Sequence, residues 1–180
     1  MDELTAKNTL VEVKKEALNR GYELSLSTIG ASMFPLLGSR NKIIVIRCDF
    51  EKLKPGDIIL FKSPTNDGVL IAHRLIRKTK NKNGYIFITK GDTNFNNDKP
   101  FTEEAIIGKI IKIKKKNLNI LLEGSLGKIV NKTFLLLSIS RINYFGFILF
   151  RKLKVLIFLV FQVFCPTKCK FPAYKNITLG

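Results

Sequence analysis

The spacing of apolar residues near the N-terminus predicts one amphipathic helix. Between Thr5 and Arg20, apolar side chains recur near one face of a helical wheel, namely Leu10, Val13, Ala17 and Leu18. Gly21 follows directly and provides a stop signal. We therefore expect residues 1–27 to form an N-terminal segment built on a single amphipathic helix.

After Lys42 the pattern changes to short apolar runs separated by turn sequences. The first run, Ile43-Ile44-Val45-Ile46, is rich in β-branched residues and is typical of a buried strand. Turn residues of the Pro-Gly-Asp and Asn-Asp-Gly types separate the later runs. The expected strands cover residues 43–46, 58–61, 69–76, 85–89, 106–113 and 118–122. This spacing predicts a mainly β domain over residues 28–123, as an all-β barrel or a sandwich-like sheet.

The pattern changes again near Glu123-Gly124, and residues 124–180 form an apolar and basic C-terminal tail. The uninterrupted run 155–165 is shorter than the roughly 20 residues of a membrane span. On a helical wheel, residues 141–164 place their basic and amide side chains on one half and their apolar ones on the other. This pattern predicts an amphipathic helix lying in a membrane interface. A core helix packed on the sheet is the alternative.

The charge of the chain narrows the classes of partner. There are 31 Lys and Arg residues against 14 Asp and Glu, a formal net charge of +17. Such a surface attracts polyanions, either nucleic acid or an anionic membrane. Residues 1–20 are mixed in charge and have no apolar run, so they do not read as a secretory signal.

Cysteine and histidine are too few for a disulfide framework or a His-rich zinc site. Three cysteines, Cys48, Cys165 and Cys169, form an odd set, and His73 is the one histidine of the sequence. Cys165 and Cys169 have the spacing of half a metal site, and no second half is found. We expect neither a metal nor a cofactor.

Three stretches contain candidate residues for hydrolytic catalysis. Ser32 follows Gly30 on a turn, where a hydroxyl can be exposed beside its own amide N–H. His73 lies within a predicted strand and is the side chain whose ordinary pKa suits a general base near neutrality. Asp92 and Asp98 lie in the polar loop 90–100, and either carboxylate can hold the tautomer of the histidine.

Each of these signals has an ordinary structural alternative. A Gly-x-Ser is often a plain polar turn, a histidine can merely be tolerated on a half-buried strand, and an Asp- and Asn-rich loop often caps its own backbone. Their order along the chain favours the chemical interpretation.

Taken together, these residues resemble a known family, the type I signal peptidases. The matching boxes follow the order of the family across residues 29–111: Gly30-x-Ser32-Met33-x-Pro35, Lys54-Pro55-Gly56-Asp57-Ile58, His73-Arg74, Thr89-Lys90-Gly91-Asp92-x-Asn94…Asp98 and Ile107-Gly108-Lys109. A histidine stands where bacterial housekeeping members carry a catalytic lysine. The chain is therefore most similar to the endoplasmic-reticulum, archaeal and sporulation type.

The resemblance implies a fold, an activity and roles for residues. The fold would be a β-barrel or coiled sheet of the signal-peptidase and LexA-like superfamily, docked on the cell membrane. The activity would be that of a serine endopeptidase that cleaves leader or signal segments after small residues in extended precursors. Ser32 would be the nucleophile and His73 the base, with Asp98 as the preferred partner of His73 and Asp92 as a second important acid.

The oxyanion and substrate positions are expected beside the nucleophile. The Ser32 N–H would meet the oxyanion, while Gly30 replaces a serine that assists in some relatives and leaves no side chain to help. A second backbone donor is therefore expected nearby. Ile29 and Met33 would line a shallow pocket for small side chains.

The chain departs from the family in two places. Members of this type usually carry an N-terminal membrane anchor, whereas any anchor of this chain would be C-terminal. The Gly-Asp that usually follows the serine box is replaced by Gly38-Ser39-Arg40-Asn41. Housekeeping pre-protein processing therefore stays open beside a specialised processing peptidase.

Two other classes of function compete with the protease. The charge of +17 permits a nucleic-acid-binding module, but the aromatic residues lie mostly in the apolar tail, and no helix-turn-helix or aromatic platform is evident, so we expect no nucleic-acid partner. An inactive member of the superfamily, acting as a scaffold at the membrane, is the other alternative. The presence of Ser32, His73 and both aspartates argues against it.

Overall fold

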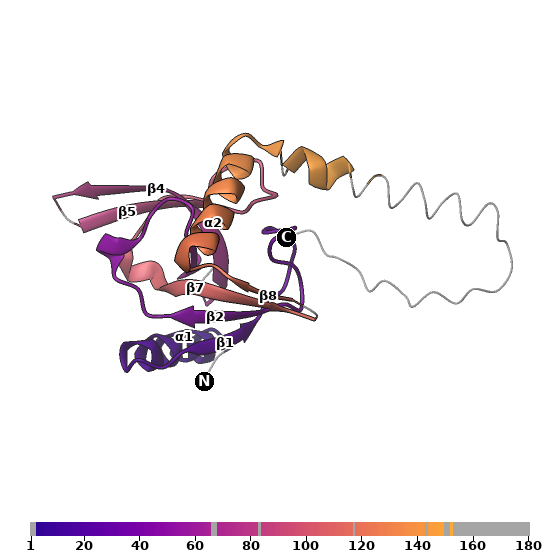
Figure 1. Ribbon diagram of the computed structural model, residues 1–180. Helices are drawn as coiled ribbons and strands as arrows, with labels where there is room; N and C mark the ends of the chain where they lie inside the picture. The colour runs from indigo at the N-terminus through magenta and orange to yellow at the C-terminus, as the bar shows by residue number, and fades with distance from the viewer. Residues whose placement is uncertain are drawn as a thin grey trace, which may run out of the picture. The chain divides into compact units, whose positions relative to one another are not determined.

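A curled antiparallel sheet of eight strands forms the centre of the described part of the protein (Figure 1). The computed structural model describes residues 3–65, 68–82, 84–116, 118–142, 144–149 and 152. The strand order is β1-β2-β7-β3-β4-β5-β6, with β8 paired to β7. The strands are β1 (Leu24–Ser27), β2 (Lys42–Ile46), β3 (Ile58–Lys62), β4 (Leu70–Asn81), β5 (Gly84–Lys90), β6 (Phe101–Thr102), β7 (Ile106–Lys115) and β8 (Leu118–Leu121).

The predicted mainly β class with an N-terminal helix is therefore confirmed. Each of the six predicted strands is present, and β4 and β7 run on by several residues into polar sequence. The strands β1 and β6 carry weak sequence signals and are additions to the prediction. The predicted turn at Asn66-Asp67-Gly68 includes two residues outside the described part of the chain.

The N-terminal helix α1 (Glu3–Asn19) packs on β7 and β1 with a face that overlaps the predicted one only in part. Val11 and Leu18 are buried, at 3% and 1% exposure, whereas Leu10 and Val13 are exposed at 54% and 59%. The buried pair is seven residues apart, which is two helical turns, so both side chains lie on one line along the helix. The sequence contains enough apolar residues on both sides of α1 to suggest either face.

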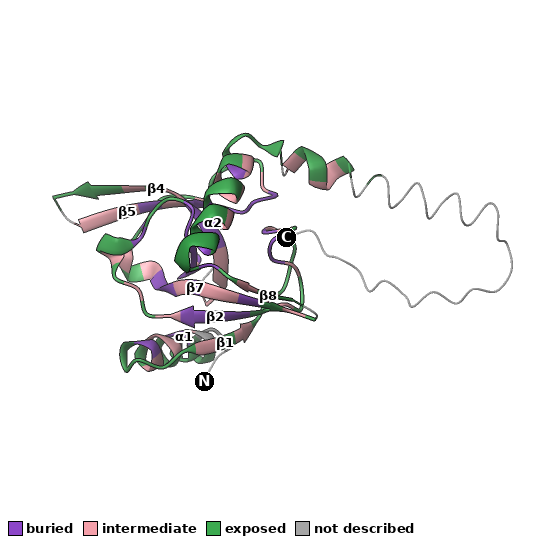
Figure 2. Ribbon diagram, viewed as in Figure 1, coloured by how far each residue is buried: buried purple, intermediate pink, exposed green. Residues whose placement is uncertain are grey.

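Two clusters of buried residues form the core, and Figure 2 shows buried residues in purple along the strands. The first joins α1 to β2, β7 and the loop that carries Ser32, and the second lies among β3, β4, β5 and β6. Buried aromatic rings fill the second cluster, where Phe61 stacks on Phe101 with 4.3 Å between ring centroids. Successive residues of β3 enter the two clusters in turn, so this strand, which pairs with β4, has little freedom to shift.

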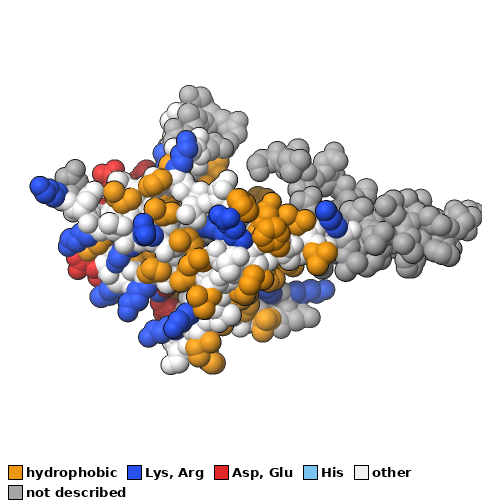
Figure 3. Space-filling model, turned by 90° about the horizontal axis from the view of Figure 1, so that it is seen from above, with side chains coloured by type: hydrophobic (Ala, Val, Ile, Leu, Met, Phe, Trp, Pro, Cys, Tyr) orange, Lys and Arg blue, Asp and Glu red, His pale blue; other side chains and the backbone are white. Residues whose placement is uncertain are grey.

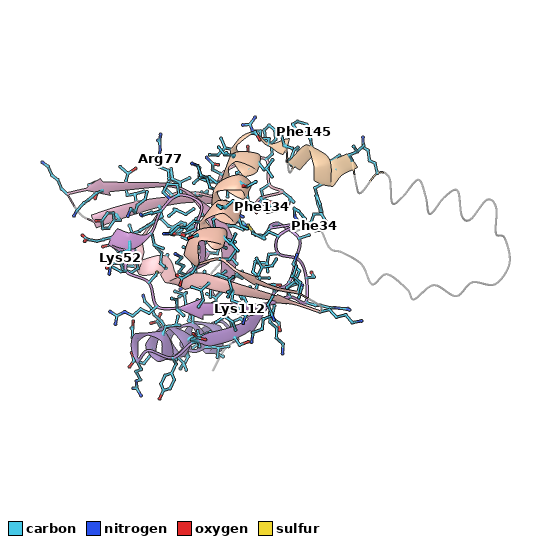
Figure 4. The ribbon with its side chains drawn as sticks, in the orientation of Figure 1. Phe34, Lys52, Arg77, Lys112, Phe134 and Phe145 are labelled. Carbon is cyan, nitrogen blue, oxygen red and sulfur yellow. The ribbon has the colours of Figure 1, made fainter. Side chains whose placement is uncertain are left out.

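A second helix, α2 (Gly124–Ile139), packs against β8 and β4. The Asn131 amide donates to the Leu122 carbonyl at 3.1 Å, and the Phe134 ring lies 5.5 Å from the Arg74 guanidinium (Figure 4). The chain divides into compact units at Phe147–Ile148. This boundary lies beyond the change of composition at residue 123, so α2 belongs to the same unit as the sheet.

The described C-terminal residues cover only part of the predicted tail. After α2, residues 144–149 are helical, while most of the predicted amphipathic helix 141–164, and both Cys165 and Cys169, lie outside the described residues. Within the described part, no helix combines the length and the apolar character that crossing a bilayer requires.

Candidate active site

Ser32 lies in a loop that connects β1 to β2 and is closed at its base by polar contacts. Thr28 continues the pairing of the two strands, because its N–H donates to the Asn41 carbonyl at 2.9 Å and its hydroxyl to the Gly38 carbonyl at 2.6 Å. Apolar side chains anchor the far part of the loop in the core, namely Met33, Leu36 and Leu37 at 2–4% exposure. Ser32 is half-buried between these two anchors.

Gly30 gives this loop a backbone conformation that other residues rarely adopt. Its φ is +94°, in the region that favours glycine. The Gly30 N–H donates to the Ser39 hydroxyl at 2.9 Å, and that hydroxyl donates to the Gly30 carbonyl at 3.1 Å. The space where a side chain of residue 30 would begin is open. Ser39 therefore holds the backbone two residues before Ser32 while leaving the surface beside it clear.

His73 lies on β4 and contacts Ser32 and Asp98 through its two ring nitrogens. Its Nε2 is 3.0 Å from the Ser32 Oγ, and its Nδ1 is 2.7 Å from the Asp98 Oδ2. The ring is 6% exposed and packs edge-on against Phe61. An ionised carboxylate accepts only, so Nδ1 carries the proton and the Nε2 of the neutral ring can accept from the serine hydroxyl.

Asp98 is brought to His73 by the end of the loop that follows β5. Its N–H donates to the Thr89 carbonyl at 2.8 Å, and the Thr89 hydroxyl donates to its Oδ2 at 2.6 Å. Burial raises the pKa of Asp98, but the hydrogen bond and charge of His73, together with the Thr89 hydroxyl, outweigh burial and lower the pKa below its ordinary value. Asp98 is therefore an ionised partner of His73 near neutral pH.

Asp92 does not contact His73 and instead pairs with Arg74, the next residue on β4. The guanidinium Nε and Nη2 donate to the two carboxylate oxygens at 2.8 and 2.7 Å, and Nη1 donates to the Gly56 carbonyl at 2.8 Å. Both side chains are fully buried. Burial raises the pKa of Asp92, and the two bonds from Arg74 oppose this rise by favouring the carboxylate.

Thr93 links the loop of the aspartates to the loop of Ser32. Its N–H donates to the Ser32 carbonyl at 2.9 Å, and its hydroxyl donates to the Ala31 carbonyl at 3.0 Å. Gly91 permits this close approach, because a Cβ there would lie 2.9 Å from the Ser32 carbonyl oxygen. The two loops are thus joined by backbone contacts directly beside the candidate nucleophile.

Three of the predicted site residues, Ser32, His73 and Asp98, come together in one hydrogen-bonded chain. The sequence leaves two carboxylates open as partners of His73. In the structure Asp98 contacts His73, whereas Asp92 contacts Arg74. Asp92 thus has contacts that stabilise the site without reaching the imidazole.

The predicted substrate pocket requires a correction. Met33 is 2% exposed and belongs to the core beneath the loop, so it supports the loop and presents almost no surface to a ligand. Ile29 is 99% exposed and therefore lines no formed pocket. The Ser32 N–H makes no hydrogen bond to any described residue, so it is available to a ligand. The Gly30 N–H, in contrast, is already occupied by Ser39.

Sequence reasoning missed the supporting role of four polar residues around the hydrogen-bonded site residues: Thr28, Ser39, Thr89 and Thr93. Hydroxyl residues are common in loops and strand ends, so nothing in their spacing distinguishes them from ordinary turn residues. Thr89 alone carries a signal, because it stands at the end of a predicted strand next to the Lys-Gly-Asp sequence.

Comparisons of the chain with models of known protein families and with curated proteins found no match.

The buried pair of Arg74 and Asp92 predicts a large effect of a small substitution. In Asp92→Asn the guanidinium keeps its buried position but loses its counter-charge, and breaking such a pair typically costs about 3–5 kcal/mol. We expect the free energy of unfolding, measured by urea denaturation, to fall by about this amount. Glu16→Gln, which breaks the exposed pair with Arg20, is the matched control and should change little. Equal effects of the two substitutions would contradict the structural role of Asp92.

The lowered pKa of Asp98 predicts how its contribution to stability depends on pH. A carboxyl whose pKa is lower in the folded than in the unfolded state stabilises the fold above the ordinary carboxyl pKa of about 4. This contribution is lost as the pH falls through the folded-state pKa. We expect Asp98→Asn to lower the melting temperature at pH 7 and to have a clearly smaller effect at pH 3. A difference from the unsubstituted protein that is the same at both pH values would contradict the assignment.

Proposed function

We propose that this protein is a serine endopeptidase of the signal-peptidase type, which cleaves leader or signal segments from precursor proteins or peptides. The observation that carries the proposal is the hydrogen-bonded chain from the Ser32 Oγ through His73 to Asp98, with distances of 3.0 and 2.7 Å. A hydroxyl, a base and an orienting carboxylate in this order are the parts that activate a serine nucleophile. The resemblance of the surrounding motifs to type I signal peptidases favours the same activity and a fold of that superfamily.

In this proposal, Ser32 attacks the carbonyl of the scissile peptide bond while the His73 Nε2 accepts its proton. General-base assistance of this kind contributes roughly 10²–10⁴-fold in rate. The imidazolium that forms is stabilised by Asp98, whose lowered pKa keeps it ionised. His73 then donates the proton to the leaving amine, and an acyl group remains on Ser32. A water molecule, deprotonated by His73, then attacks the acyl carbon. The bond to the Ser32 Oγ breaks, this oxygen takes the proton back from His73, and the carboxylic acid product is released.

The developing oxyanion would be stabilised by the free N–H of Ser32. One such donor is typically worth about 10²–10³-fold in kcat. The open space beside Gly30 leaves room for the substrate backbone to approach this N–H. An extended substrate would pair along a strand edge beside the loop, as extended peptides commonly do with sheets. The mechanism uses neither a metal nor a cofactor.

A substitution test decides between this activity and an inactive scaffold. A pre-protein with an Ala-x-Ala site is incubated with the protein, and the products are identified by mass spectrometry. Ser32→Ala and His73→Ala should each lower the cleavage rate by at least about 10³-fold, since both groups act on the reacting atoms. Ser27→Ala, a neighbouring exposed serine on β1, should leave the rate unchanged. Full cleavage by either of the first two variants would remove the proposal.

We further propose that the C-terminal part associates with the membrane of the cell. The outer side of α2 exposes large apolar side chains beside lysines and carries no acidic residue: Leu126, Ile129, Leu136 and Ile139 with Lys128 and Lys132. Figure 3 shows hydrophobic side chains interspersed with Lys and Arg on the face seen from above. Apolar contact combined with positive charge is typical of binding to an anionic lipid interface.

Sedimentation with lipid vesicles tests this association. The full chain should sediment with vesicles that contain phosphatidylglycerol, and binding should fall with pure phosphatidylcholine or at high salt, since the electrostatic part is screened. The double variant Leu126→Glu, Ile129→Glu should lower the bound fraction, because it places two acidic groups on the outer side of α2. The double variant Leu10→Glu, Val13→Glu, at two exposed apolar positions of α1, is the control and introduces the same charge. Equal binding by the double variant of α2 would exclude α2 as the contact.

A further inference from the structure

The chain directly after α2 contacts both loops of the candidate site through aromatic rings. The Arg141 guanidinium lies 4.0 Å from the centre of the Phe95 ring, and the Tyr144 ring packs edge-on against the same ring at 5.2 Å. The Phe147 ring lies 5.6 Å from the Phe34 ring. Figure 4 labels Phe34 and Phe145 in this region.

The two rings that receive these contacts belong to the loops that carry Ser32 and the two aspartates. Phe34 is two residues after Ser32, in the loop between β1 and β2. Phe95 lies between Asp92 and Asp98, in the loop that follows β5. One short segment, residues 141–147, therefore packs on the nucleophile loop and on the aspartate loop together.

The segment is itself tied to the sheet immediately before it begins. The buried Lys90, the residue before Gly91, donates from its Nζ to the Ser138 carbonyl near the end of α2. Arg141, with φ of +61°, then turns the chain so that Tyr144 and Phe147 become half-buried. Ile142 and Phe145 stay exposed, at 58% and 61%. The segment thus has an inner side that contacts the loops and an outer side that does not.

We infer that Arg141, Tyr144 and Phe147 are positioning residues of the proposed protease, which hold the loops of Ser32 and Asp98 at their reacting distance. This inference rests on the proposed function for its catalytic consequence. They act on the two loops through their contacts with Phe95 and Phe34. Residues 141–147, which the sequence assigns to a separate tail, then belong to the catalytic unit.

Two of the three groups of the site lie outside the sheet, so their positions depend on contacts with other segments. Ser32 and Asp98 both lie in loops, and only His73 lies on a strand. A displacement of about 1 Å between reacting groups can lower a rate by roughly 10²-fold. Thr93 joins the two loops on one side of Ser32, and the aromatic contacts join them again through the segment after α2.

The test uses the full chain and two readouts, one of which does not depend on activity. The double variant Tyr144→Ala, Phe147→Ala should lower kcat on the pre-protein substrate about ten- to a hundredfold and change KM less than about twofold. Hydrogen–deuterium exchange of the peptides that cover residues 28–41 and 91–98 should become faster. Ile142→Ala, on the exposed side of the same segment, should change neither readout. The single variant Tyr144→Phe should retain the activity of the original protein, because an aromatic ring remains at both positions.

The outcomes separate this inference from the proposed function. Faster exchange in both loops, in a chain that cleaves no substrate, would support the positioning role and remove the protease. Cleavage that depends on Ser32, together with unchanged kcat and unchanged exchange in the double variant, would overturn the positioning role alone. If circular dichroism shows that the double variant does not fold, Tyr144→Leu with Phe147→Leu replaces it, with the same expected changes and the same outcome overturning the inference.

Discussion

The buried pair of Arg74 and Asp92 is the interaction on which the arrangement of the site depends. Arg74 is adjacent to His73 on β4, and Asp92 stands six residues before Asp98 in the same loop. The bidentate contact between them fixes the start of this loop against the strand of the histidine. An unpaired charge in this position would be costly to bury, so the loop cannot leave β4 without a large loss of free energy. The third bond of Arg74, to the Gly56 carbonyl, extends the same constraint to the turn before β3.

The neighbouring residues Arg74 and His73 therefore have different roles: Arg74 fixes the loop, and His73 contacts Ser32 and Asp98. Successive side chains of a strand point to opposite faces of the sheet, so Arg74 can be closed off completely while His73 turns toward Ser32. The same division recurs in the loop, where Asp92 has no exposed surface and the Asp98 side chain keeps 20% exposure. The Arg–Asp pair is closed off from solvent, whereas the His–Asp pair next to Ser32 keeps a small exposed surface, mostly on Asp98.

The sequence predicts the parts of the fold whose signal is local. Runs such as Ile43–Ile46 and Ile58–Phe61 have one reasonable interpretation, because β-branched residues between turn sequences form buried strands. The face of α1 is predicted only in part: Leu18 is buried as expected, but the choice between Leu10 and Val11 depends on the partner surface at β7 and not on the helix itself. Ser32, His73 and the two aspartates can be found from residue type and order. Residue type and order alone leave open which aspartate meets the histidine, because the answer depends on where the loop after β5 returns to Thr89. The preference for Asp98 comes from the family resemblance, and the structure places Asp98 against the histidine.

Most of the residues that sequence reasoning missed contact backbone atoms, which explains why they were missed. Ser39 and Thr93 act on backbone atoms of the loop around Ser32, and the Thr89 hydroxyl adds a bond to a carboxylate that already accepts one from His73. Contacts to backbone atoms require only that a donor be nearby, so they impose no spacing on the sequence. Met33 illustrates the converse: its type and position beside Ser32 suggest a substrate contact, but its burial in the core shows that it anchors the loop from below. A loop that holds a hydroxyl in a defined position needs apolar anchors beneath it and polar contacts at its base, and here residues on both sides of Ser32 supply them.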